Sequence, residues 1–255
     1  MIKAITFTGG LGAQIVSAAG YFYLQSKFEP VKADLSYFLQ PYHEAQPGVK
    51  GDVSHWSWEL GSYGLHFESF AQVDSDAYEF IWDGPEKVRL AFLGLAQPEI
   101  RKKFPISLES VRFRNNLFGS DSYACVHIRR GDYLNVASFI VDDDSIFRIM
   151  SKVQNFVKNV LVISETALSD RMIVLTASLK CNVTSVIGGD PSVLHGVMRL
   201  SDILISANSQ FSLTAASLRD EAALSFLPSQ HDGPINSYLN TYLSSIREFQ
   251  IVTKT

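Results

Sequence analysis

The chain has 255 residues, of which 46% are hydrophobic and 19% are charged. This length suits one large or two ordinary domains, and the composition excludes a disordered chain because it can bury a real core. The formal net charge of −4 gives no support to a general nucleic-acid-binding protein, which would need a basic surface. No apolar run is long enough for a membrane span, so none is expected.

The two cysteines, Cys125 and Cys181, lie in apolar sequence without metal-ligand spacing. We expect both to be reduced and buried, as in a cytoplasmic protein. Residues 1–8 are typical of a strand and not of a signal peptide. A cytoplasmic location is therefore predicted, with peripheral contact at the inner membrane left open.

The chain begins with a predicted strand at Ala4–Thr8, a glycine turn at Gly9–Gly12 and a helix at Ala13–Lys27. Glycines let a backbone approach a ligand closely, and a helix start offers unpaired N–H groups to a phosphate. The spacing differs from the dinucleotide fingerprint and lacks the Walker lysine, so packing explains the turn equally well. A second strand is expected at Val31–Leu35.

Residues 40–64 are rich in glycine, proline and aromatic residues. Histidines and aromatic side chains are interleaved there: His43, His55, Trp56, Trp58 and Tyr63. Aromatic rings beside polar groups commonly hold sugars, but a loop that packs its own aromatic side chains is at least as good an explanation. The histidines lack metal spacing.

The second half alternates strands with helices. Strands are expected at Tyr123–Val126, Val160–Ile163, Asn182–Ile187 and Ile203–Ile205, and helices at Ile146–Asn159, Ala167–Leu179, Leu194–Ser201 and from Leu213 onward. Polar residues follow each strand, as expected of a nucleotide crevice at the carboxyl ends of a parallel sheet. A polar stretch near residues 115–120 predicts domains of residues 1–117 and 118–255.

The most informative segment is His127-Ile128-Arg129-Arg130-Gly131-Asp132-Tyr133, directly after the first of these strands. Two guanidiniums there make a fork suited to a phosphate or diphosphate, because each can bond two oxygens at once. Asp132 is close enough in sequence to hold an arginine in a fixed orientation. A surface ion-pair turn explains the same residues about equally well.

Three aspartates, Asp142 to Asp144, precede the helix at Ile146–Asn159. They could suggest a metal site, but an N-cap followed by acids in the first helical turn explains them more simply. No metal site is predicted.

Three segments together resemble the bacterial α-1,2-fucosyltransferase family and its wider superfamily of GDP-fucose-dependent transferases. Residues 127–133 resemble the family's signature, Gly9-Gly10-Leu11-Gly12-Ala13-Gln14 resembles its Gly-Gly-Leu-Gly-Asn-Gln, and Ser206–Ser212 resembles its Asn-Ser-Ser-Phe-Ser segment. The resemblance runs from residue 7 to about residue 218. It implies two Rossmann-like α/β domains of the GT-B type with a cleft between them, a sugar-nucleotide donor, inversion at the anomeric carbon, and no cofactor or required metal.

The resemblance also implies roles for single residues. Arg129 would hold the β-phosphate of the donor, with Asp132 as its brace, and these two form the expected catalytic pair. The expected nucleotide-binding residues are His127, Arg130, Gly10, Gly12, Asp190, Ser209, Gln210 and Phe211. Asp190 is the nearest candidate for reading the guanine. Ala13 stands where the family has Asn, and Leu213-Thr214 stands where it usually has a Trp pair.

The predicted enzyme is a glycosyltransferase that moves fucose from GDP-fucose to a glycan or lipid-linked saccharide, as in bacterial cell-surface polysaccharide biosynthesis. Two alternatives stay open: the same scaffold with another sugar nucleotide, and a non-catalytic homologue that binds a nucleotide or glycan. The predicted partners are the donor and a saccharide acceptor. Four residues are candidates for the base that activates the acceptor: Glu44, Asp52, His43 and His55. The oligomeric state is not predicted.

Overall fold

The computed structural model describes residues 2–39, 57–68, 77–82, 84–131, 134, 140–220, 223–228 and 249–252. The described residues divide into two compact units, one within residues 1–105 and one within residues 106–228 and 249–252. Helix α5 (Leu108–Phe118) therefore belongs to the second unit, and the expected domain boundary between residues 117 and 118 falls at its end. Among the described residues, no helix combines the length and the apolar composition needed to cross a bilayer.

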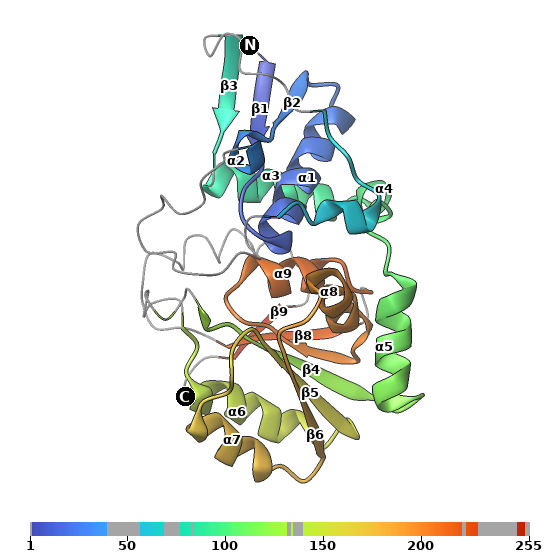
Figure 1. The fold of residues 1–255 in the computed structure, drawn as a ribbon, viewed down its shortest axis with the longest axis vertical. Coiled ribbons are helices and arrows are strands. Elements are labelled where there is room, and N and C mark those ends of the chain that lie inside the picture. The colour runs from blue at the N-terminus through green and yellow to red at the C-terminus, as the bar shows by residue number, and fades with distance from the viewer. Residues whose placement is uncertain are drawn as a thin grey trace. The chain divides into compact units, whose positions relative to one another are not determined.

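The first unit holds a parallel sheet of three strands in the order β2-β1-β3 (Figure 1). Its strands are β1 (Ile2–Thr6), β2 (Val31–Asp34) and β3 (Tyr78–Ile81). Its helices are α1 (Leu11–Ser26), α2 (Ser36–Leu39), η2 (Leu60–Tyr63), α3 (Pro85–Leu95) and α4 (Pro98–Arg101). Helices α1 and α3 pack closely because Gly94 has no side chain, and a Cβ there would collide with the backbone of Ala19.

Trp58 belongs to an aromatic cluster inside the first unit. Its ring centroid lies 5.8 Å from that of Phe7, 5.5 Å from that of Phe38 and 5.9 Å from that of Phe67. This packing favours the interpretation in which the loop buries its own aromatic side chains, at least for Trp58. Residues 40–56, with the candidate bases Glu44, Asp52, His43 and His55, lie outside the described residues.

The second unit holds a parallel sheet of six strands in the order β6-β5-β4-β7-β8-β9 (Figure 1). Its strands are β4 (Tyr123–Ile128), β5 (Asn159–Ser164), β6 (Asn182–Ile187), β7 (Ile203–Ile205), β8 (Leu224–Pro228) and β9 (Phe249–Val252). The chain winds outward from β4 to β6, then returns to the other side of β4 and continues to β9. This is the doubly wound order, and its direction reverses between β4 and β7.

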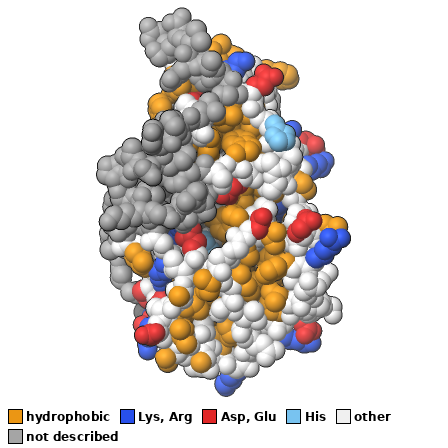
Figure 2. All heavy atoms as spheres, viewed as in Figure 1, with side chains coloured by type: hydrophobic (Ala, Val, Ile, Leu, Met, Phe, Trp, Pro, Cys, Tyr) orange, Lys and Arg blue, Asp and Glu red, His pale blue; other side chains and the backbone are white. Residues whose placement is uncertain are grey.

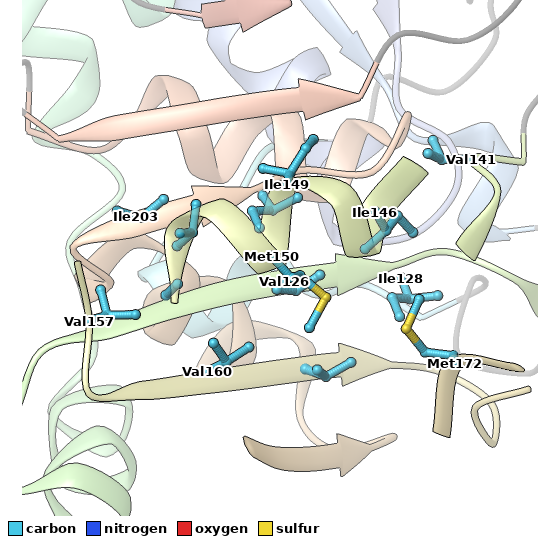
Figure 3. Close-up of a cluster of buried hydrophobic side chains, with 14 residues drawn as sticks. Val126, Ile128, Val141, Ile146, Ile149, Met150, Val157, Val160, Met172 and Ile203 are labelled. Carbon is cyan, nitrogen blue, oxygen red and sulfur yellow. The ribbon is translucent and has the colours of Figure 1, made fainter. Parts of the chain in front are cut away.

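Two layers of helices cover this sheet, as Figure 1 shows. On one face, α6 (Asp143–Val153) and α7 (Asp170–Ala177) bury a cluster that includes Val126, Met150 and Met172 (Figure 3). On the other face, α5, α8 (Pro191–Leu200) and α9 (Gln210–Ser217) bury a cluster that includes Tyr123 and Leu204. Successive residues of a strand point to opposite faces, so His127 shares the α8–α9 face with Tyr123.

The start of β7 is fixed against the start of β4. The carboxylate of Asp202 accepts a hydrogen bond from the backbone N–H of Tyr123 at 2.8 Å, and the N–H of Asp202 donates to the Tyr123 carbonyl at 3.0 Å. The guanidinium of Arg219 donates to the carbonyls of Ser201 and Asp202. The pairing that follows sets Val126 opposite Ile205, so Ser206 comes next to His127.

Several boundaries differ from the sequence predictions. Helix α9 begins at Gln210 and not at Leu213, because Ser209 acts as its N-cap. Helix α6 ends at Val153 and not at Asn159.

The two cysteines differ in burial. Cys125 is fully buried, and burial raises the pKa of its thiol. Cys181 is only half-buried, so the expected burial is wrong for Cys181.

On the face shown in Figure 2, the described acidic and basic side chains are interspersed and neither sign forms a continuous patch.

Candidate functional site

The reversal of strand order brings two predicted segments together at one edge of the second sheet. The segment that starts with His127 leaves the carboxyl end of β4, and Ser206–Ser212 leaves the carboxyl end of its neighbour β7. The ring centroids of His127 and Phe211 lie 5.4 Å apart, with an interplanar angle of 64°. Ligands of doubly wound sheets bind at this position, so this edge is the candidate site.

Arg129 is held by a carboxylate from one of the polar strand ends, in a pairing that the sequence did not predict. Its guanidinium forms an ion pair and hydrogen bond with Glu165, the residue that follows β5. The side chains of Arg129 and Glu165 are only 10% and 26% exposed, so solvent screens the pair less than it would a surface pair. Glu165 therefore orients Arg129. Asp132, the predicted brace, lies outside the described residues.

Arg130 is held by the first turn of α6. Its guanidinium bonds to Asp143 and also donates to the Arg129 carbonyl at 2.9 Å. Asp143 in turn accepts a hydrogen bond from Ser169. The two guanidiniums that could bind a diphosphate thus each have a carboxylate partner, one that follows β5 and one from the first turn of α6.

The neighbouring aspartates also have partners. Asp142 is the N-cap of α6, as predicted, and accepts from the N–H of Ser145 at 2.7 Å. Asp144 pairs with Arg171 at 2.6 Å on the surface. Within the described part of the chain, no group of three His, Cys, Asp or Glu side chains is arranged to hold a metal ion.

The N-terminus of α9 faces the same edge and carries no acidic residue in its first turn. Unpaired N–H groups and the positive end of the helix dipole make such a terminus suitable for a phosphate. The Ser209 hydroxyl accepts from the N–H of Phe211 at 3.4 Å, so this side chain serves as the helix cap. Gln210 begins the helix and is half-buried.

His127 is 3% exposed, and its Nδ1 has no hydrogen-bond partner among the described residues. Burial, and secondly the positive charge of Arg129, lower the pKa of His127 to about 3. The imidazole is therefore neutral at physiological pH. A neutral ring nitrogen buried at the ligand edge can donate to or accept from an uncharged group such as a nucleoside hydroxyl.

We expect His127 to make folding sensitive to mild acid. In the unfolded chain the pKa of this histidine is about 6.5, so below about pH 6.5 the unfolded state takes up a proton that the folded state excludes. Stability should fall by up to about 1.36 kcal/mol per pH unit from this group. Urea unfolding between about pH 6.5 and about pH 5 should show that the free energy of unfolding falls less steeply with pH in His127→Asn than in the wild type. Equal slopes for both proteins would contradict the burial of a neutral ring.

The other predicted site residues are placed elsewhere. Asp190 follows β6, two strands from β4, and its carboxylate caps α8 by accepting from the N–H groups of Ser192 and Val193 at 2.8 and 3.1 Å. Burial opposes ionisation of Asp190, but these bonds and the Ser192 hydroxyl lower its pKa overall. Guanine recognition by Asp190 stays a prediction.

The glycine turn of the first unit is organised by Gln14, which the sequence analysis left without a role. The amide of Gln14 is fully buried and donates at 2.8 Å to the carbonyls of both Gly9 and Ser57. Its oxygen accepts from the N–H of Glu59 at 2.9 Å. Gly9 has a φ of +65°, a conformation that favours glycine. Gly10 is the N-cap of α1, and Gly12 is buried in its first turn.

Glu165 also explains the glycine of the arginine motif. Gly131 has a φ of +46°, and a Cβ on it would lie 2.7 Å from Oε2 of Glu165. A side chain at this position would be strained and would displace the carboxylate that holds Arg129. A sequence signal for Glu165 existed, because it follows a buried strand, but only the pairing of β4 with β5 shows which cation it meets.

If the ligand is the GDP that the family resemblance implies, Glu165→Ala should weaken its binding about tenfold. Arg129 would lose its orientation and with it part of a hydrogen bond to a charged phosphate, which is worth about 1.5–3 kcal/mol. Glu165→Gln can still accept from Arg129 and should stay within about threefold of the wild type. Calorimetric titration with GDP measures both. Asp144→Ala, which breaks an exposed ion pair in the same unit, is the matched control. Unchanged affinity in Glu165→Ala would exclude this role for Glu165.

The fold is similar to solved structures of glycosyltransferases, whereas no protein-family model and no curated protein sequence matches the chain. POFUT1 in complex with GDP matches with a TM-score of 0.51 and 11% identity, over 89% of this chain and 97% of that one. ADP-heptose lps heptosyltransferase II of E. coli matches with a TM-score of 0.51 and 8% identity, over 99% of this chain and 90% of that one.

A glycosyl transferase family 9 protein from Veillonella parvula matches with a TM-score of 0.53 and 8% identity, over 99% of this chain and 87% of that one. At these identities the similarity shows the fold. The predicted α/β class with parallel sheets is thereby confirmed, and the structural neighbours are glycosyltransferases of the GT-B type.

Proposed function

We propose that the protein is an inverting α-1,2-fucosyltransferase that moves fucose from GDP-fucose to a glycan or lipid-linked saccharide of a bacterial surface polysaccharide. The observation that carries the proposal is the strand reversal between β4 and β7. It gathers two carboxylate-held guanidiniums and a helix N-terminus without acidic residues at one sheet edge. This combination suits a nucleoside diphosphate. POFUT1, whose fold is similar, has been crystallised with GDP-fucose.

The chemistry assigned to these residues is charge stabilisation. The bond between the anomeric carbon and the β-phosphate oxygen breaks, and its electron pair stays on the phosphate. The acceptor oxygen bonds to the anomeric carbon from the opposite side and loses its proton to a base or to water. Arg129, oriented by Glu165, would meet the charge that grows on the leaving phosphate. Arg130 and the N–H groups of α9 would bind the remaining phosphate oxygens.

We further propose that transfer needs no divalent metal, because the two guanidiniums supply the positive charge. Asp142, Asp143 and Asp144 each have another partner, a helix N-terminus or an arginine. Activity should persist in EDTA and should not rise when magnesium or manganese is added. Activity that is lost in chelator and restored by metal would overturn this part of the proposal.

The donor is tested by binding and turnover together. Thermal shifts with GDP, UDP and ADP, followed by the matching sugar nucleotides, should give the largest stabilisation with GDP and GDP-fucose. A ligand at 100 times its Kd adds about 2.7 kcal/mol to stability. Release of GDP from GDP-fucose, and its increase with saccharide acceptors, then tests transfer. Stabilisation by UDP or ADP alone would refute the GDP-fucose assignment.

A different sugar nucleotide on the same scaffold is the second candidate. It is favoured by Ala13, which stands in the first turn of α1 and carries a methyl group where the resembled family has an amide. The same binding and turnover measurements separate this candidate from a non-catalytic binder. The enzyme hydrolyses or transfers its donor, whereas the binder binds it without turnover.

A further inference from the structure

Phe211 lies between two buried imidazole rings. Its ring centroid is 5.4 Å from that of His127 and 5.5 Å from that of His195. His195 comes from α8 and is fully buried, whereas Phe211 belongs to the first turn of α9. The contact therefore links α8 to the part of α9 that faces the ligand edge. Neither the arginine motif nor the Ser206–Ser212 segment includes His195.

A hydrogen bond ties His195 to the same turn. Its Nε2 lies 3.2 Å from Oγ1 of Thr214, and this hydroxyl donates to the carbonyl of Gln210 at 2.7 Å. The single hydroxyl proton of Thr214 is used toward a backbone carbonyl, that of Gln210 or of Phe211 at 3.1 Å. We therefore assign the proton of the His195–Thr214 bond to Nε2 of His195. Burial, followed by the charge of Arg199 and by His127, lowers the pKa of His195 well below its ordinary value, so the ring is neutral.

We propose that His195 is a positioning residue for the nucleoside diphosphate. Through Thr214 it holds the Gln210 carbonyl, and through ring contact it holds Phe211 against His127. The buried His195 thus supports both the N–H groups at the start of α9 and the ring of Phe211. The inference rests on the proposed function of this edge as a nucleotide site, and it adds a residue that does not touch the ligand.

Two pairs of variants separate positioning from general packing. Thr214→Val removes the hydroxyl and keeps the shape, and Thr214→Ser keeps the hydroxyl. His195→Leu removes the donor, and His195→Gln can replace it. We expect Thr214→Val and His195→Leu to raise the Kd for GDP and the KM for GDP-fucose about fivefold, with kcat changed less than about twofold. Thr214→Ser and His195→Gln should recover most of the affinity.

Thr176→Val is the matched control, because Thr176 is buried on α7, on the other face of the sheet, and donates within its own helix. It should lose stability in urea as Thr214→Val does, but keep the wild-type Kd for GDP. If Thr214→Val and His195→Leu also kept that Kd, their role would be packing alone and the inference would be wrong.

A spectroscopic readout tests the tautomer directly. The ring ¹⁵N resonances of His195 should show a proton on Nε2, and they should shift when GDP binds although GDP does not touch the ring. A proton on Nδ1, or resonances that ignore GDP, would overturn the inference. If GDP binds the wild type but the variants bind equally well, only His195 is misassigned. If no nucleoside diphosphate binds the wild type, the proposed function and this inference both fail.

Discussion

Arg129→Ala should lower kcat for sugar transfer about 10²- to 10³-fold while the protein stays folded. Loss of one preorganised donor to a developing negative charge costs about 2.7–4 kcal/mol in the barrier. Arg129 meets this description because it leaves the end of β4 and is held by Glu165 in a poorly exposed ion pair. Initial rates at saturating GDP-fucose, with circular dichroism and urea unfolding as checks on the fold, give the measurement.

Two controls sharpen this experiment. Arg129→Lys keeps the charge but cannot make the bidentate contact, so it should recover little activity. Arg171→Ala removes an arginine that pairs with Asp144 on the surface of the same unit, with a side chain 59% exposed, and should leave the rate within about twofold, since exposed ion pairs contribute about 0–1 kcal/mol. Near-wild-type rates for Arg129→Ala would remove Arg129 from the catalytic step.

Met150→Ala should destabilise the second unit by about 2–5 kcal/mol, the usual cost of truncating a buried Met or Leu to Ala. Met150 is fully buried on α6, where it packs in the cluster with Val126 and Met172 (Figure 3). The same helix carries Asp143, which holds Arg130, so loosening of α6 should also weaken GDP binding. Urea unfolding with calorimetric titration of GDP measures both effects.

Ile173→Ala is the control for this core substitution. Ile173 lies on the neighbouring helix α7 and is 52% exposed, so its truncation should change stability by no more than about 0.5 kcal/mol. A loss below about 1 kcal/mol in Met150→Ala would mean that α6 is not packed on the sheet as described.

Three central strands of the second sheet, β4, β5 and β7, were predictable because they are largely apolar runs. Strands β4, β5, β6 and β7 all coincide closely with the expected segments. The later strands β8 and β9 were not predicted. Strand β8 pairs with β7 and β9 pairs with β8, and local sequence patterns do not encode such long-range contacts.

The sequence predicted which segments form the site, but not which residues hold the site side chains in place. The arginines and Phe211 were singled out, and the sheet order brings their segments together. The pairings that support them were not predicted. Glu165 lies at a polar strand end but 36 residues from Arg129, and His195 lies on a helix whose pattern suggests only packing. The hydrogen-bonded role of Gln14 depends in the same way on Ser57 and Glu59. Such partners become visible only once strand register and helix placement are known.

The hydrogen bonds of Asp202 and Arg219 at the start of β7 limit where the chain can change in length. Asp202 and Arg219 fix where β7 begins against Tyr123, and β7 has only three residues before the ligand edge. Inserting or deleting one residue between Asp202 and Ser206 would move the following segment by about 3.3 Å and turn its side chains to the other face. Phe211 would then leave His127. Homologues that keep the activity should therefore vary in length between other elements but not within this span.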